Sequence, residues 1–194
     1  MSPRAYRMGK RAESVARTRA AIREAARDEY AETGVEGASM QSIARRAGVA
    51  PGTVLYQYPD PVELAREVIQ ESARTMRFPT ADAVDAAAGI EARVRWLARE
   101  LFRVYAGSER EYRAWSRSRS HPAIAESDAW YARTYQEVLA AVLGAEHADP
   151  RAFQVASAII DPGFRANLLA RGLSDEEAAD TAADLVIGWL AGTS

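Results

Sequence analysis

Residues 39–58 read SMQSIARRAGVAPGTVLYQY, and this stretch predicts two short helices joined by a tight turn. Ser39 is a favourable N-cap for the first helix, and Gly48 can adopt the left-handed conformation that the turn requires. Pro51 suits the first turn of the second helix. That helix should end before Pro59, because the residue that precedes a proline avoids helical geometry.

The small and apolar residues of the same stretch are spaced for two crossing helices. Ala44, four residues before Gly48, provides a small side chain at the crossing point. Four further side chains are placed to hold both helices against a preceding helix: Ile43, Val49, Val54 and Tyr58. This combination is typical of a helix-turn-helix unit. The spacing also arises by chance in alanine-rich helical proteins, so the flanking residues are needed to decide.

The rest of the chain predicts an all-α protein of about nine helices. Alanine, arginine, glutamate and leucine are good helix formers, and no segment alternates with the period of a strand. We expect the first helix to run from near Ser14 to Thr33. Pro162 should kink or split a later helix, and Ser174 with Glu177 forms a capping box for the last one. The predicted domains are an N-terminal head over residues 1–60 and a helical body over residues 61–194.

The charge distribution separates these two parts of the chain. The net charge is −2, but residues 1–58 contain 10 Lys and Arg against 6 Asp and Glu, whereas the remaining residues are acidic. A basic head on an acidic body favours nucleic acid as a partner of the head alone. A chance fluctuation is the alternative interpretation.

Several function classes are disfavoured by composition. The chain has no cysteine and only two histidines, so neither a metal site nor a cofactor is expected. No apolar run approaches the roughly 20 residues of a membrane span, and residues 1–11 lack the apolar core of a secretory signal. We therefore expect a cytoplasmic protein without a membrane partner. No catalytic residues are predicted, because no nucleophile–base pair, phosphate loop or Glu-x-x-His pattern is present.

The flanks of the helix-turn-helix stretch resemble the TetR family of bacterial transcriptional regulators. The resemblance covers residue 20 to about residue 69 and rests on these elements: Gly34-Val35-Glu36-Gly37-Ala38-Ser39, Ile43-Ala44-x-x-Ala47-Gly48-Val49-x-x-Gly52-Thr53, Tyr56-x-Tyr58-Pro59 and Leu64. It implies a DNA-binding head, a helical body with a ligand cavity, and a homodimer. We find no comparable resemblance beyond about residue 70.

The resemblance places the second short helix in the major groove of DNA. Thr53 offers a hydroxyl to a phosphate, Gln57 can read an adenine edge or contact a phosphate, and Tyr56 can contact a phosphate or a thymine methyl. The predicted DNA contacts of the motif are Ser39, Gln41, Ala50, Pro51, Thr53, Tyr56 and Gln57. Half-buried packing is the alternative for Tyr56. Arg45 and Arg46 are expected on a solvated helix face.

Two features near the motif modify this prediction. Many family members carry a phosphate-binding lysine two residues after the proline that ends the recognition helix, and this chain has Pro61 there. A basic N-terminal extension could compensate, with Arg4 and Arg7 lying in an adjacent minor groove. Arg17 and Arg19 continue this basic segment. A disordered solubilising tail is the alternative.

The body contains candidate ligand and dimer residues. Aromatic side chains with polar tips can line a small-molecule pocket or form an ordinary core, and our candidates for the pocket are Trp115, Trp130, Tyr131 and Tyr135. The family resemblance implies that the last helices pair between two copies. The candidates for that interface are Phe153, Ile160, Leu168, Leu185 and Trp189, with the protomer's own core as the alternative.

The sequence therefore predicts a dimeric transcriptional regulator that binds a palindromic operator. A small, largely apolar or aromatic effector is expected to release it from DNA, which makes repression the leading hypothesis. Two alternatives stay open: a helical DNA-binding interaction protein without a small ligand, and an activator.

Overall fold

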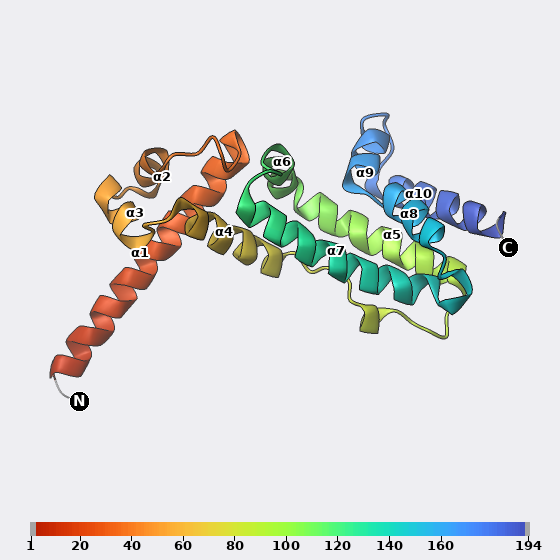
Figure 1. Cartoon of the computed structure of the whole chain (residues 1–194), viewed down its shortest axis with the longest axis horizontal. Coiled ribbons are helices and arrows are strands. Elements are labelled where there is room, and N and C mark those ends of the chain that lie inside the picture. Colours follow the sequence, from red (N-terminus) through yellow and green to blue (C-terminus); the bar gives the residue numbers. More distant parts are fainter. Residues whose placement is uncertain (1–2, 193–194) are drawn as a thin grey trace. The chain divides into compact units, whose positions relative to one another are not determined.

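The computed structural model describes residues 3–192, with side chains from Ala12 onward, and the regular elements of that range are all helices (Figure 1). The predicted all-α class is confirmed. The α-helices are α1 Pro3–Thr33, α2 Met40–Ala47, α3 Pro51–Gln57, α4 Pro61–Thr75, α5 Ile90–Gly107, α6 Glu109–Arg117, α7 Pro122–Leu143, α8 Pro150–Ile159, α9 Pro162–Leu169 and α10 Asp175–Ala191. Short 3₁₀ turns lie at Ala81–Ala83 and Ala145–His147.

The chain forms two compact units, which we call the head unit and the body unit. The head unit comprises residues 1–75 and 110–127, and the body unit comprises residues 76–109 and 128–194. The head unit is therefore larger than the 1–60 segment of the sequence analysis. Helix α4 joins it because Leu64 and Val68 are buried in the head core.

Helix α1 begins earlier than the position near Ser14 that the sequence suggested. It starts at Pro3, and proline is well accommodated in the first turn of a helix. The residues between Pro3 and Ser14 contain no helix-breaking proline and only one glycine, so the helix continues through them. Its inner face contributes Ile22, Ala26 and Tyr30 to the head core.

Local capping explains where several helices begin and end. Ser39 caps α2, and its hydroxyl and that of Ser42 form a reciprocal capping box. Pro162 divides the penultimate segment into α8 and α9, as predicted, and the Asp161 carboxylate accepts a hydrogen bond from the amide of Gly163 at 2.7 Å. The capping box of Ser174 and Glu177 at the start of α10 is confirmed as well.

The core of the body unit forms mainly between α5 and α10, with α7 and α8 contributing. Leu97, Leu101 and Phe102 of α5 and Val186 of α10 are fully buried in it. Burial of these side chains supplies the main stabilisation of the body unit. Throughout the described range, no helix combines the length and apolarity that crossing a bilayer requires. The same residues contain no group of three or more metal-ligating side chains.

Candidate nucleic-acid interface

Helix α3 presents one exposed and uncharged face. Pro51, Gly52, Leu55 and Tyr56 lie on it at the spacing of successive helical turns, and all four are exposed. Tyr56 is 78% exposed and Leu55 is 51% exposed, whereas Val54 on the opposite face is fully buried. Large apolar side chains gathered on one exposed helix face mark an interaction surface.

The turn before α3 has the geometry that the sequence predicted. Gly48 has φ +67°, in the left-handed region, and its amide donates to the carbonyls of Ala44 and Arg45. An added Cβ at Gly48 would meet nothing within 4 Å, so the backbone conformation explains this glycine and lack of space does not. Ala44 is fully buried between the helices. The expected helix-turn-helix is therefore present.

Tyr58 secures the end of α3 to the neighbouring helices. Its ring is fully buried, and its hydroxyl donates to the Glu67 carboxylate of α4 at 2.8 Å. The guanidinium of Arg23 in α1 lies 3.5 Å from the same hydroxyl oxygen. Burial is the main reason why the pKa of Tyr58 is raised above its usual range, so the hydroxyl stays protonated and able to donate.

Arg19 of α1 also stabilises the end of α3. Its guanidinium donates to the main-chain carbonyl of Gln57 at 2.9 Å and to Glu67 at 2.6 Å. The same group lies 4.2 Å from the centre of the Tyr58 ring, which is a cation–π contact. Arg19, which the sequence analysis placed in the basic extension, therefore acts within the head unit. Arg4 and Arg7 lie in α1, but their side chains lie outside the described residues.

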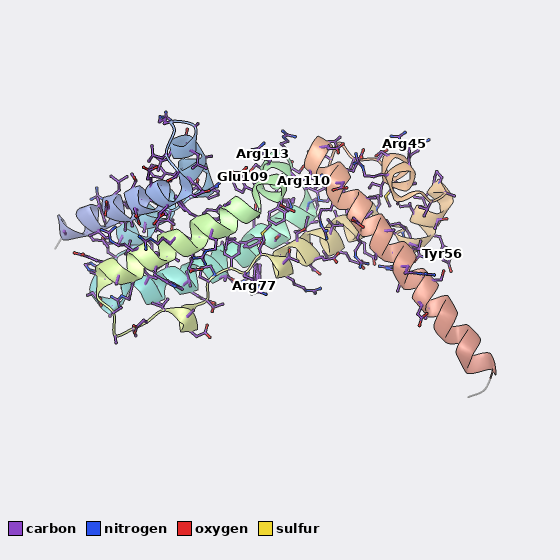
Figure 2. All side chains as sticks on the ribbon, turned by 180° about the vertical axis from the view of Figure 1, so that it is seen from behind. Arg45, Tyr56, Arg77, Glu109, Arg110 and Arg113 are labelled. Carbon is purple, nitrogen blue, oxygen red and sulfur yellow. The ribbon has the colours of Figure 1, made fainter. Side chains whose placement is uncertain are left out.

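The two arginines of α2 have different environments. Arg46 forms ion pairs with Glu29 and Glu32 of α1, at 3.0 and 2.6 Å. Arg45 is exposed and has no ion pair among the described residues, and it lies one turn after the exposed Gln41. Arg45 and Tyr56 are labelled on the head in Figure 2. Both arginines were expected on a solvated face, but of the two only Arg45 offers an available cation.

Four further predicted DNA contacts lie beside this face. Ser39 is exposed, but its hydroxyl is engaged in the α2 capping box. Thr53 and Gln57 are half-buried at the border of the exposed α3 face, and Ala50 precedes it as an exposed residue. Leu55 was not predicted as a contact. Its position four residues after Pro51 indicated that it would share the exposed face of α3 with that proline.

The start of α4 carries no cation at the position where the family often has lysine. Pro61 begins the helix, and the Asp60 carboxylate accepts a hydrogen bond from the amide of Val62 at 2.9 Å. The available N–H group is thus satisfied by a carboxylate of the chain itself. Pro61 cannot replace the phosphate contact of a lysine.

The four predicted ligand residues belong to different units. Trp115 packs against the head core, whereas Trp130, Tyr131 and Tyr135 of α7 lie in the body unit. Trp115 therefore belongs to a different unit from the other three candidates. Its sequence spacing could not reveal this, because α6 follows a body helix in the chain.

Aromatic rings gather around Tyr131 within the body unit. Its ring lies 4.9 Å from that of Phe78 and 5.0 Å from that of Trp130, and its hydroxyl contacts the Met76 sulfur at 3.3 Å. Phe78 and Tyr105 are 6.5 Å apart, ring centre to ring centre. We call Phe78, Tyr105, Trp130 and Tyr131 the aromatic cluster. Phe78 was not predicted as part of it.

The hydroxyl of Tyr135 is buried and lacks a hydrogen bond of normal geometry. Burial raises the pKa of Tyr135 above its usual range, and a contact with Ser157 opposes the shift. An unsatisfied buried donor is uncommon in folded proteins, and a bound ligand is one group that can satisfy it.

A separate groove of about 330 Å³ lies on the body unit between α5 and α10. It has mixed charge over an apolar floor, and its lining residues are Arg99, Phe102, Arg103, Ala106, Asp175, Glu176 and Ala179. None of the predicted ligand residues lines this groove. It therefore does not correspond to the expected aromatic pocket.

The predicted dimer residues also differ in exposure. Leu185 of α10 is 47% exposed, which is unusual for a leucine of a folded core. Ile160 is only 1% exposed and belongs to the body core, so the structure removes it from the candidate dimer surface. Phe153, Leu168 and Trp189 are half-buried against that core. Leu185 is the candidate with the most available surface.

Glu109 and Arg110, where the chain passes from the body unit to the head unit, form separate ion pairs. Within the body unit, the buried guanidinium of Arg165 lies 3.0 Å from the Glu109 carboxylate. Within the head unit, Arg110 lies 2.9 Å from Asp28 of α1. Glu109 and Arg110 are labelled in Figure 2. The first two residues of α6 therefore have partners in different units.

Comparisons with known proteins agree with this architecture. Residues 22–68 match the model of the tetR family of bacterial regulatory proteins. A TetR-like transcriptional regulator from Rhodococcus sp. RHA1 has a similar fold, with a TM-score of 0.70 at 18% identity over 90% of this chain and 96% of that chain. No curated protein sequence matches the chain.

Two other solved structures share the fold. NalD, the secondary repressor of the MexAB-OprM multidrug efflux pump in Pseudomonas aeruginosa, has a TM-score of 0.58 at 19% identity over 90% of this chain and 96% of that chain. The multidrug binding protein EbrR in complex with imidazole has a TM-score of 0.58 at 23% identity over 86% of this chain and 88% of that chain. The resemblance noted in the sequence is thus confirmed: residues 22–68 match the model of the tetR family of bacterial regulatory proteins, and the chain shares its fold with TetR-like transcriptional regulators.

Proposed function

We propose that the protein is a dimeric, ligand-relieved repressor that binds a palindromic operator through α3. The observation that carries this proposal is the exposed face of α3, on which Tyr56 is 78% and Leu55 is 51% exposed in the described part of the chain. The family and the fold point to a regulator and not to an enzyme. Two copies are needed because one helix reads too few base pairs to be selective in a genome.

The aromatic cluster and the Tyr135 hydroxyl support a ligand site in the body unit. Rings close to Tyr131 offer apolar and stacking surface, and the buried hydroxyl of Tyr135 offers one directional hydrogen bond. A few polar groups in an apolar wall are typical of small-molecule sites. EbrR structures hold ethidium and proflavin, so we propose planar aromatic compounds as the class to test first.

The first experiment identifies the operator. Purified protein is used to select bound sequences from random duplex DNA, and affinity is then measured by fluorescence anisotropy at several salt concentrations. We expect an enriched sequence with two inverted half-sites. A pool without any enriched sequence overturns the proposed function, because a helix-turn-helix regulator must distinguish its operator from random DNA.

The second experiment tests release from DNA. Ethidium and proflavin bind DNA themselves, so their binding to the protein is measured first without DNA, by quenching of tryptophan fluorescence. Release is then followed with the selected operator and with a non-operator duplex as control. Tyr135→Phe should weaken dye binding without lowering stability, since it removes a buried hydroxyl that makes no well-formed hydrogen bond. If no compound of a broader aromatic screen weakens operator binding, the result favours the alternative without a ligand.

The direction of regulation is tested in a reporter assay with the selected operator. Placed over a promoter, the operator should give lower expression when the protein is present. Higher expression with the operator upstream identifies an activator instead.

A further inference from the structure

The exposed face of α3 lacks the groups that usually read guanine. Pro51, Gly52, Leu55 and Tyr56 carry no charge, and the Tyr56 hydroxyl is their only side-chain polar group. Arginine and lysine are the side chains that most often bind the O6 and N7 atoms of guanine. Helix α3 contains neither of them.

The nearby arginines do not supply the missing guanine contact. Arg46 is paired with Glu29 and Glu32, and Arg19 is held by Glu67 and by the Gln57 carbonyl. Arg45 is available, but it belongs to α2, the helix that crosses the DNA backbone in helix-turn-helix complexes. Its charge is therefore suited to a phosphate.

One group in the major groove matches an apolar helix face. The C5-methyl of thymine is the only apolar substituent that a standard base pair presents there. We propose that Leu55 and Tyr56 recognise the operator through thymine methyl groups. This inference rests on the proposed function and specifies what the same helix reads: thymine at the positions of each half-site that face Leu55 and the Tyr56 ring.

Removal of single methyl groups from the DNA tests this inference directly. In the selected operator, each thymine is replaced by deoxyuridine, which lacks the methyl and keeps the same hydrogen bonds. Burial of one methyl-sized group corresponds to a change in affinity of about fourfold. We expect that loss at the contacted thymine of one half-site, and about 15-fold when both half-sites are changed. Replacing thymines outside the half-sites is the matched DNA control.

Protein variants identify which side chain contacts the methyl. Leu55→Ala should bind the thymine and uracil operators with nearly equal affinity at the position that Leu55 faces. Tyr56→Phe should keep the preference for thymine, because the ring remains, whereas Tyr56→Ala should lose it at its own position. Val15→Ala, an exposed apolar residue of α1, should leave every thymine-to-uracil ratio unchanged. Thermal unfolding of each variant verifies that the head is folded.

The outcomes separate this inference from the proposed function. A selected operator whose half-sites contain no thymine, or one that tolerates uracil at every position, overturns methyl recognition and leaves operator binding intact. Equal thymine preference in Leu55→Ala, Tyr56→Ala and the parent protein overturns it as well. A pool without enrichment overturns both claims.

Discussion

Nothing in the fold of the protein itself requires a glycine at position 52 of α3. Its φ is not positive, and an added Cβ would meet nothing within 4 Å. Glycine in a helix costs about 0.5–1 kcal/mol relative to alanine. Because it lies on the exposed face, we propose that the backbone at Gly52 approaches DNA closely.

Gly52→Ala should therefore change stability and DNA binding in opposite directions. We expect unfolding free energy to rise by about 0.5–1 kcal/mol, because the unfolded chain loses freedom. Operator affinity should fall by about tenfold, because the new methyl must be fitted into a packed interface. Denaturant titration and anisotropy measure the two effects. Gly107→Ala, at the end of α5 with similar open space, is the matched control and should affect stability alone.

Arg45 and Arg46 provide a second contrast at the residue scale. Arg45→Ala should lower the magnitude of the slope of log K against log salt by about 0.9, the value for one phosphate contact. Arg46→Ala should keep that slope, because its guanidinium is already paired with Glu29 and Glu32. Affinity measured at four or more salt concentrations gives both slopes. Equal slopes for Arg45→Ala and the parent protein contradict a phosphate contact.

At the scale of elements, the position of α3 depends on more than its own residues. Helix α3 spans only Pro51–Gln57, which is too short to be stable alone. Val54 and Tyr58 are buried beneath it, and Arg19 of α1 binds its last carbonyl. The recognition helix is thus held by α1 and α4.

Arg19→Ala tests this support. A hydrogen bond from a charged group contributes about 1.5–3 kcal/mol, and a cation–π contact adds about 0.5–1 kcal/mol. Because Arg19 is partly exposed, we expect a loss of about 1–3 kcal/mol in the free energy of unfolding of the head, together with faster amide exchange in α3. Arg17→Ala, an exposed neighbour without a described ion pair, is the stability control. Unchanged stability with a reduced salt slope would instead assign Arg19 to DNA.

At the scale of the whole molecule, the proposed function requires two copies and a link between sensing and binding. Leu185 is the predicted dimer residue with the most exposed apolar surface. We expect Leu185→Glu to raise the dimer dissociation constant at least about 100-fold, because burial of an unpaired charge at an interface costs several kcal/mol. Analytical ultracentrifugation measures this constant. Ala81→Glu, an exposed change outside α10, should leave the dimer intact.

The start of α6 is the candidate for the link between the two units. Glu109 is held by Arg165 in the body unit and Arg110 by Asp28 in the head unit. The effector in this test is the compound found in the aromatic screen. Without effector, Arg110→Ala should bind the operator with the affinity of the parent protein. Its release from the operator should require a several-fold higher effector concentration. Arg103→Ala, an exposed arginine whose ion pair with Glu100 lies within α5, is the matched control. Unchanged release by effector in Arg110→Ala contradicts a role for this ion pair.

The sequence by itself determined the all-helical class and the helix-turn-helix. These follow from local chemistry: helix propensities, the Ser39 cap, the left-handed Gly48 and the stop at Pro59 act within a few residues of one another. The family resemblance of residues 20–69 was readable for the same reason.

Only the tertiary structure decided which side chains are free to act. Among the described residues, it paired Arg46 and left Arg45 without an ion pair, buried Ile160 and exposed Leu185, and packed Trp115 against the head core. Each of these outcomes depends on partners distant in sequence, such as Glu29 for Arg46. Burial and ion pairing are properties of the packed molecule, so residues of the same type and similar local context can have opposite environments.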